Sequence, residues 1–369
     1  MNPLRIAVIG AGHLGRIHAR IAAGLEEIEL VAVADPSETA RSNVAHETGA
    51  CAVPDYRQLI GDIDAAIVAA PTFLHHEIGT ELLAAGVPLL VEKPLATNVI
   101  EANNLVALAR RQGVVLQVGH VERFNPALTC VTSEVRDPKY IEATRTSAYT
   151  FRSTDVGAVL DLMIHDLDIV LSLARSTVEH VDAMGISVLG GHEDIATARL
   201  SFASGCIAHL AASRVSFEQC RKMSIFTSRC CTSLNFATHE TTVIKPREDL
   251  LRRDFRVDQL SAEQRAYCKE HLFDELLVRT RTEAPAVNAI QEEQRDFVAA
   301  IQSGKSPRVD GAAGRDAVAV AELILQKIEE HAWDGNSSGR HGPFAMPALP
   351  IIAGSTQPAT GREQRRRAG

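Results

Sequence analysis

The sequence predicts a two-part α/β protein, with a doubly wound parallel sheet near the N-terminus and then an α+β domain built on a large, mostly antiparallel open sheet. Between Arg5 and Gly119 short apolar runs alternate with helical patterns, which is typical of parallel strands joined by crossover helices. After Pro126 the runs become longer and alternate apolar with polar residues, which indicates antiparallel strands. A chain of 369 residues, 46% of them hydrophobic, is long enough to build two cores.

The elements of the first part follow one another regularly. Its strands are expected in RIAVIG, ELVAVAD, AAIVAAP, PLLVEKP and VVLQVG, and its helices over residues 14–25, 38–47, 74–85 and 100–111. These strands are continuous apolar runs, as expected for a sheet that helices cover on both faces. We therefore assign residues 1–122 to one domain.

The second part is expected to span residues 123–332. Its strands are predicted in KYIEATRTSAYT, VEHVDAMGISVLG, DIATARLSF, CIAHLAAS, MSIFTS and TSLNF, and its helices in VLDLMIHDLDIV and over residues 289–303 and 315–331. Residues 333–369 are rich in Gly, Pro and Ser and end in a basic cluster, so we expect a disordered tail there, with a weak partner-binding segment as the alternative.

Composition narrows the kinds of partner. A net charge of -8 and the lack of a basic stripe argue against nucleic-acid binding and favour a small polar or anionic ligand. The seven cysteines are odd in number, dispersed and without a C-x-x-C pair, which argues against a disulfide framework or a metal site. No run approaches the roughly 20 apolar residues of a membrane span, and the chain enters RIAVIG without a leader. We therefore expect a cytoplasmic protein that does not bind membranes.

The first strand runs into GAGHLG, in which Gly10, Gly12 and Gly15 match the G-x-G-x-x-G pattern of dinucleotide sites. Gly10 permits the tight turn, Gly12 lets a pyrophosphate approach the backbone, and Gly15 lets the following helix pack on the strand. His13 and Leu14 complete the loop, and the N-terminus of the helix attracts the phosphate charge. The sequence therefore predicts a Rossmann-type cofactor site.

Asp35 comes 20 positions after Gly15, at the end of the second strand, where a carboxylate can accept hydrogen bonds from both ribose hydroxyls. A phosphate at the 2′ position would face this carboxylate, so the site should favour NAD over NADP. Two alternatives stay open. Asp35 merely begins the turn that continues through Pro36 and Ser37, or Arg41, one turn into the next helix, tolerates a 2′-phosphate.

Polar residues gather at the carboxyl edge of the first sheet, where open parallel sheets bind ligands. Lys93 follows the fourth strand in VEKPLA, where Glu92 can pair with it or brace the turn and Pro94 stiffens the chain. An ammonium group there can hydrogen-bond the oxygen of an alcohol whose carbon gives up hydride. Thr72 and His75 lie near the same edge, and His75 is equally suited to helix packing and to the wall of the cofactor site.

Residues that follow the fifth strand reach the same crevice. They are His120, Arg123 and Asn125, in GHVERFNP, and Arg123 is suited to hold an anion. Arg145 and Arg152 flank the strand that enters the next helix. They could meet a diphosphate, although solvation at the surface explains them equally well.

The segment VLDLMIHDLDIV, residues 159–170, places polar side chains in an otherwise apolar helix. At about 100° per residue, Asp161, His165 and Asp168 fall within a stripe about 60° wide. A buried carboxylate requires partners or a solvated cavity, so the stripe faces either a structural network or the crevice opposite Lys93. Oxidation of a secondary alcohol needs a base near neutral pKa, which His165 supplies, with Asp161 orienting the ring and stabilising its protonated form. Asp168 could contact substrate, or could cap and brace.

Together, GAGHLGRIHA, the element at residues 71–75, EKP and the D-x-x-x-H-x-x-D helix before an open sheet resemble the Gfo/Idh/MocA oxidoreductases. The resemblance covers about residues 5–330, including EEQRDFVAAIQSGKSPRVDGAAGRDAV near the end. It implies an N-terminal Rossmann domain that binds NAD and a second domain that binds substrate and forms homo-oligomers. It also implies that Lys93 is the EKP lysine and that Asp161 and His165 lie beside the transferred hydride.

Two segments resemble one particular group of members within this family. GHVERFNPA and DLMIHDLDIVLSL are similar to the members that oxidise UDP-N-acetylglucosamine at C3, ahead of an aminotransferase, in making 2,3-diamino sugars for lipid A. The expected function is NAD-dependent oxidation of a sugar alcohol, at C3 of that UDP-sugar, with a downstream aminotransferase as partner. Two alternatives stay open: a dehydrogenase of a free sugar or inositol-type polyol, and a non-catalytic dinucleotide-binding regulator. A regulator needs no lysine, aspartate and histidine together, so we favour the enzyme.

Overall fold

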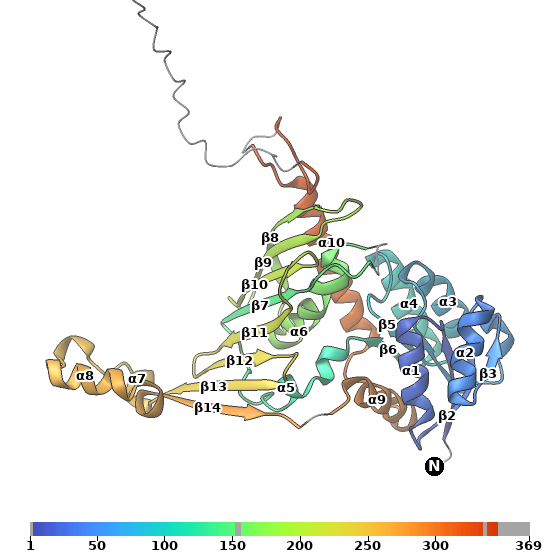
Figure 1. Ribbon diagram of the computed structural model, residues 1–369, viewed down its shortest axis with the longest axis horizontal. Helices are drawn as coiled ribbons and strands as arrows, with labels where there is room; N and C mark the ends of the chain where they lie inside the picture. The colour runs from blue at the N-terminus through green and yellow to red at the C-terminus, as the bar shows by residue number, and fades with distance from the viewer. Residues whose placement is uncertain (1–2, 152–155, 286, 335–337, 346–369) are drawn as a thin grey trace, which may run out of the picture.

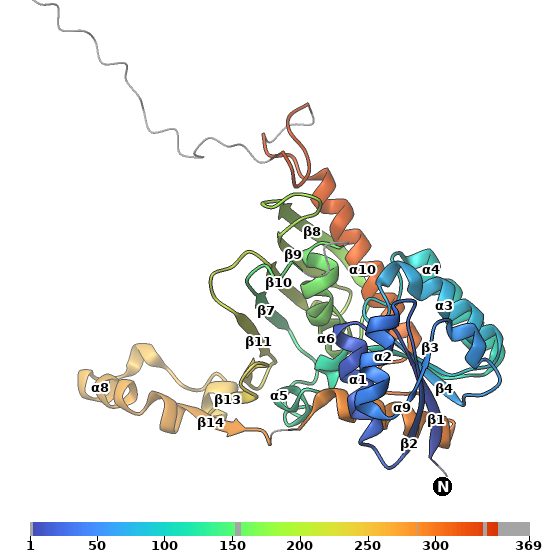
Figure 2. The ribbon, with the colours of Figure 1, turned by 45° about the vertical axis from the view of Figure 1, so that its right-hand side comes forward.

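The computed structural model describes residues 3–151, 156–285, 287–334 and 338–345 of the chain. These residues form a parallel sheet with helices on both faces, at the right of Figure 1, and a larger open sheet in the centre. A short helical arm projects from the far edge of the larger sheet, which the turned view of Figure 2 also shows. The predicted fold class is confirmed.

The first sheet has the strand order of a doubly wound nucleotide-binding fold. In spatial order its strands are β3 (Cys51–Val53), β2 (Ile28–Ala34), β1 (Leu4–Ile9), β4 (Ala65–Val68), β5 (Leu89–Glu92) and β6 (Leu116–Gly119). Its crossover helices are α1 (His13–Ala23), α2 (Glu38–Thr48), the 3-10 turn η1 (Tyr56–Leu59), α3 (Thr72–Ala84) and α4 (Val99–Gln112). The order reverses between β1 and β4, so the loops after these two strands open on one crevice at the carboxyl edge.

The second sheet has eight strands and is open. In spatial order they are β14 (Leu277–Glu283), β13 (Glu240–Pro246), β12 (Cys231–Asn235), β11 (Cys220–Phe226), β7 (Tyr140–Thr146), β10 (Ile207–Ser213), β9 (Ile195–Phe202) and β8 (Val178–Ile186). Neighbouring strands are antiparallel except β7 and β10, which are parallel. In β7 the buried side chains of Ile141 and Ala143 alternate with more exposed ones, because one face alone packs on helices.

The predicted helix over residues 159–170 is present, but it begins differently from the expectation. Its first turn is a π-helix, η3 (Val159–Met163), in which the Ile164 N–H donates to the oxygen of Val159, five residues back. A regular helix, α6 (Ile164–Ala174), follows. A π turn holds more residues than an α turn, so side chains before and after it no longer share the face that α-helical spacing predicts.

The closing helices connect the two sheets. In α9 (Ala289–Ser303), Phe297 is fully buried in a cluster with Ile6 and Val8 of β1. In α10 (Gly311–Glu330), the N-terminal half packs in the core of the first sheet and the C-terminal half in that of the second. The division at residues 122 and 123 stays a prediction, but α9, assigned by sequence to the second domain, packs on the first. The shorter elements η2 (Val121–Phe124) and α5 (Pro126–Thr129) lie between the sheets in sequence.

Several elements were not expected from the sequence, among them the strands β3, β13 and β14. The arm between β13 and β14 contains α7 (Glu248–Leu251), η4 (Val257–Gln259), α8 (Ala262–Glu270) and η5 (Leu272–Leu276), none of which was predicted. The helix α8 buries no side chain, so it carries no amphipathic periodicity that could reveal it.

The segment expected to be disordered is ordered in part. Within residues 338–345, the oxygen of Arg340 accepts from the Trp333 N–H at 2.9 Å and that of Pro343 from the Ser187 N–H at 3.0 Å. These hydrogen bonds attach the segment to the edge of the second sheet, which corrects the prediction there. The rest of that prediction, over residues 335–337 and 346–369, lies outside the described residues. None of the helices that the structure describes is both long and apolar enough to cross a membrane.

Candidate active site

The turn between β1 and α1 has a separate physical requirement at each of its three glycines. Gly10 has a φ of +99°, and a Cβ there would lie 2.6 Å from the oxygen of Ala69. At Gly15 a Cβ would lie 1.8 Å from the oxygen of Gly10. At Gly12 a Cβ would have nothing within 4 Å, so it would occupy the open space at the N-terminus of α1 where a pyrophosphate binds in such folds.

The carboxylate of Asp35 lies against this turn. Its Oδ2 accepts from the Ala11 N–H at 2.7 Å, and its Oδ1 accepts from the Ser37 N–H at 2.8 Å. Asp35 therefore begins the turn into α2 and at the same time presents its charge at the glycine loop. The guanidinium of Arg41 is engaged with main-chain oxygens, including that of Pro36 at 3.1 Å.

A cavity of about 380 Å³ opens at the carboxyl edge of the first sheet, facing the start of η3. Five of the residues predicted for the site line it: Leu14, Thr72, Glu92, Lys93 and Asp161. The other lining residues are Ala69, Ala70, Pro71, Phe73, Pro94, Val156 and Leu160. Four segments therefore converge on this cavity: the loops after β4 and β5, the first turn of α1, and the start of η3. His13 is exposed on the same turn of α1 but does not line the cavity.

Lys93 and Asp161 contact each other in this cavity. The Nζ of Lys93 donates to the main-chain oxygen of Asp161 at 2.8 Å and lies 3.2 Å from its Oδ1. The sequence had instead placed Asp161 against the ring of His165, one α-helical turn away. In the structure Asp161 contacts the lysine instead, and the Nδ1 of His165 has no hydrogen-bond partner among the described residues.

His165 lies beside a second histidine, His120, with ring centroids 6.4 Å apart and planes at 86°. The Nδ1 of His165 and both ring nitrogens of His120 are buried without a hydrogen-bond partner among the described residues. Burial, reinforced by the charge of Lys93, lowers the pKa of His165 well below its usual value, and burial also lowers the pKa of His120. Both rings are therefore neutral near pH 7. A neutral ring is the form that accepts a proton, and stabilisation of the protonated ring by Asp161 stays a prediction.

Asp168 braces Arg123. Its Oδ1 lies 3.2 Å from a guanidinium nitrogen of Arg123, while its Oδ2 is buried without a partner in the described part of the chain. The guanidinium also approaches the main-chain oxygen of Arg308. Substrate contact by Arg123 or Asp168 stays a prediction, and Arg152 lies outside the described residues.

Two residues that were expected to contact a ligand, Arg145 and Asn125, are buried and bound to other residues of the protein. Arg145 is 3% exposed and donates to both oxygens of Asp166 at 2.8 and 3.1 Å, and to Glu122 at 2.8 Å. It is neither solvated nor free to hold a diphosphate. The Nδ2 of Asn125 donates to Glu122 at 2.8 Å and to the oxygen of Phe236 at 3.1 Å. Asn125 therefore has a structural role in place of the expected substrate contact.

His75 and Glu92 contact residues next to the cavity through buried side-chain atoms. His75 is buried, with Nδ1 2.9 Å from the oxygen of Pro94 and Nε2 2.8 Å from that of Ala70, and a neutral ring has one N–H to donate to these two oxygens. Glu92 lies 2.7 Å from the Nε2 of His18, a residue that sequence reasoning did not assign. The available signal was a histidine among the buried positions of the first helix, three residues after Gly15.

Comparisons with known proteins agree with this geometry. Residues 4–120 match the model of an oxidoreductase family with an NAD-binding Rossmann fold, and residues 127–230 match that of the GFO/IDH/MocA C-terminal domain. The UDP-N-acetylglucosamine 3-dehydrogenase of Acidithiobacillus ferrooxidans is 32% identical over 335 residues, 89% of this chain and 98% of that protein. A solved structure of the enzyme of that name and organism aligns with a TM-score of 0.78 at 30% identity, over 89% and 99% of the two chains. The myo-inositol 2-dehydrogenase of Thermotoga maritima is 26% identical over 89% of this chain and 97% of that protein.

Proposed function

The chain belongs to the Gfo/Idh/MocA family of NAD-binding oxidoreductases, and from this premise we propose that it oxidises C3 of UDP-N-acetylglucosamine with NAD, forming the 3-keto sugar nucleotide. The observation that carries the proposal is the pairing of Lys93 with Asp161 in the cavity at the carboxyl edge of the first sheet. The similarity to a UDP-N-acetylglucosamine 3-dehydrogenase over nearly the whole of that protein supports the choice of substrate.

The residues of the first sheet fit NAD. Gly12 leaves open space at the N-terminus of α1 for the pyrophosphate, and the Asp35 carboxylate stands at the end of β2 for the ribose. When bound, NAD supplies the acceptor for the hydride. Thr72 and Leu14 line the same cavity and would form part of the wall around the cofactor.

The groups opposite the cofactor suit removal of a proton from an alcohol. Lys93 is held by Asp161, so its ammonium is oriented to stabilise the negative charge that develops on the alcohol oxygen. His165 is neutral and would accept the proton at Nε2, because its Nδ1 is buried. The charge of Lys93 also acts on His165, which keeps the base unprotonated before substrate enters.

The division of labour between the two parts of the chain is likewise a proposal. We assign cofactor binding to residues 1–122, and we assign sugar binding and homo-oligomer formation to residues 123–332. An aminotransferase that consumes the ketone is the expected partner, because oxidation of a secondary alcohol by NAD is unfavourable unless its product is removed.

The test is a coupled assay with mass spectrometry of the sugar nucleotide. UDP-N-acetylglucosamine and NAD should yield NADH and a product two hydrogens lighter, and the yield should rise when NADH is recycled or when glutamate and an aminotransferase consume the ketone. Free glucose, myo-inositol and other UDP-sugars serve as comparisons. The inositol dehydrogenase relative makes a polyol the second candidate. Much higher catalytic efficiency with a polyol, and no keto product from the UDP-sugar even with recycling, would reject the proposed substrate.

A further inference from the structure

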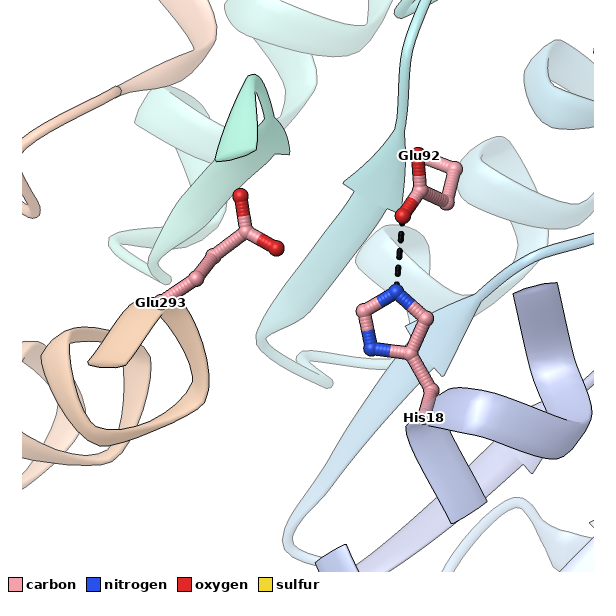
Figure 3. Close-up of side chains that lie close together, drawn as sticks. All are labelled: His18, Glu92 and Glu293. Carbon is pink, nitrogen blue, oxygen red and sulfur yellow. Dashed lines mark hydrogen bonds and ion pairs between the residues drawn. The ribbon is translucent and has the colours of Figure 1, made fainter. Parts of the chain in front are cut away.

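A second cluster of polar side chains lies behind Lys93, on the buried side of β5. His18 from α1, Glu92 from β5 and Glu293 from α9 bring side-chain nitrogen and oxygen atoms within 4.8 Å of one another (Figure 3). All three residues are buried, and Glu293 has no exposed surface. The cluster therefore joins a helix near the C-terminus to the strand that carries the proposed catalytic lysine.

Glu293 is the unusual member. Neither of its carboxyl oxygens has a hydrogen-bond partner among the described residues, and Figure 3 shows the carboxyl group turned toward Glu92 and His18. An ionised carboxylate in this position would be desolvated and would face a second carboxylate, which is strongly unfavourable. One of the two acids must therefore hold a proton.

Hydrogen bonds identify which acid is ionised. The side-chain amide nitrogen of Gln294 lies 3.0 Å from Nδ1 of His18, so Nδ1 accepts and the ring carries its proton on Nε2. That proton is donated to Glu92 at 2.7 Å, and the other oxygen of Glu92 accepts from the Lys93 N–H at 3.1 Å. Glu92 accepts at both oxygens and is ionised, which leaves the proton on Glu293.

Packing prevents Glu92 from moving away. A Cβ at Gly119 of the neighbouring strand would lie only 3.0 Å from the carboxyl carbon of Glu92, so the glycine makes room for this side chain. The position of the Glu92 carboxylate in turn holds the main chain at Lys93.

We propose that the carboxyl group of Glu293 stays protonated in the folded protein, so that Glu92 and Glu293 form a buried acid pair of which only Glu92 is ionised. This protonation state does not depend on the proposed function.

The electrostatic surroundings agree with this assignment. Burial, followed by the charge of Glu92, raises the pKa of Glu293 well above its usual value. Burial opposes ionisation of Glu92, but the hydrogen bond from His18 and the charge of Lys93 lower its pKa on balance. The other titratable groups that face the pair are His120, after β6, Asp168 on α6 and Asp296 on α9. The two aspartates are acidic, so they add to the cost of a second negative charge at Glu293.

The first test measures stability against pH in the variant E293Q, which keeps the shape but cannot ionise. Above a pKa of about 4.3 the unfolded wild type releases the proton of Glu293 while the folded protein retains it, so the wild type loses stability as pH rises. The ratio of the folding equilibrium constant of E293Q to that of the wild type should therefore rise about tenfold for each pH unit, until the pH reaches the raised pKa of Glu293. Urea unfolding at several values between pH 5 and pH 8 gives this ratio.

The matched control is E292Q, because Glu292 is the adjacent, partly exposed carboxylate on the same helix. The ratio of the folding equilibrium constant of E292Q to that of the wild type should not change with pH. A pH-independent ratio for E293Q would overturn the acid pair. A second overturning outcome is stabilisation of the wild type, but not of E293Q, by Zn²⁺ or Mn²⁺, because the three side chains would then be ligands of a metal.

A second variant, E293L, also cannot ionise, so the ratio of its folding equilibrium constant to that of the wild type should change with pH as it does for E293Q. A ratio that changed with pH in only one of the two variants would overturn the assignment of the proton to Glu293. Both measurements require no substrate, so the acid pair can hold even if the proposed substrate is rejected.

Discussion

The ammonium nitrogen of Lys93 lies 2.8 Å from the main-chain oxygen of Asp161 and 3.2 Å from its Oδ1, although the two residues are 68 positions apart. One residue follows a strand of the parallel sheet, and the other belongs to the π turn that packs on the open sheet. The contact thus connects the two parts of the chain across the crevice.

Lys93→Met should lower kcat/KM by roughly a hundredfold or more and leave NAD affinity unchanged, because the ammonium acts on the alcohol oxygen rather than on the cofactor. Asp161→Asn should cost less, since the main-chain oxygen of residue 161 still accepts from Lys93. Steady-state kinetics with a separate NAD titration distinguish these effects. Undiminished turnover in the methionine variant would remove Lys93 from the mechanism.

Asp35→Ser should narrow the preference for NAD over NADP, because it removes the carboxylate that faces the 2′ position. The hydroxyl of serine can still accept from the Ala11 or Ser37 N–H, so the turn should persist. Fluorescence titration of both cofactors against wild type and variant measures the change. Wild-type protein that bound NADP as tightly as NAD would contradict the proposed role.

Gly12→Ala should weaken NAD binding, whereas Gly15→Ala should destabilise the fold. At Gly12 the new methyl group meets nothing in the protein, so stability should be retained while NAD affinity falls at least tenfold. At Gly15 it would collide with the main-chain oxygen of Gly10, which should cost about 1–3 kcal/mol of folding free energy. Thermal unfolding with and without NAD separates the two outcomes. A stable Gly15→Ala protein would show that the helix can shift away from the strand.

Acid should destabilise the protein steeply below about pH 6.5, the ordinary pKa of histidine. Burial lowers the pKa of His75, His120 and His165, so these rings stay neutral in the folded state while the unfolded chain takes up protons. The stability they contribute is present above the unfolded pKa and is lost as pH falls toward the lowered values. Three such rings give a slope of up to about 4 kcal/mol per pH unit.

Urea unfolding between pH 5 and pH 7 checks this slope. His120→Asn should reduce it by about one proton, whereas the same change at the exposed His46 should not. A slope unchanged in His120→Asn would mean that this ring titrates normally in the folded protein.

Arg145→Met should destabilise the fold by about 3–5 kcal/mol, because Glu122 and Asp166 would be left buried without their cation. Burial raises the pKa of Asp166, and the guanidinium opposes that shift. Adding Glu122→Gln and Asp166→Asn should recover part of the loss. A variant of normal stability with a raised KM would instead indicate that Arg145 contacts substrate.

Much of the fold is predictable because the signals are local. The helix expected over residues 289–303 is α9 (Ala289–Ser303), and the glycine loop, the parallel strands other than β3 and the helices α1 to α4 are found where the patterns place them. Elements without such a pattern were missed. The arm between β13 and β14 buries little of its surface, so its helices have no apolar face that a periodic search could detect.

The sequence by itself determined the doubly wound sheet, the glycine turn and the residue types at the carboxyl edge, since each depends on neighbours a few positions away. Only the tertiary structure decided how the charges within the fold pair: Asp161 with Lys93, and Arg145 with Glu122 and Asp166. These partners come from distant segments, and a desolvated charge takes whichever counter-charge the packing brings within reach.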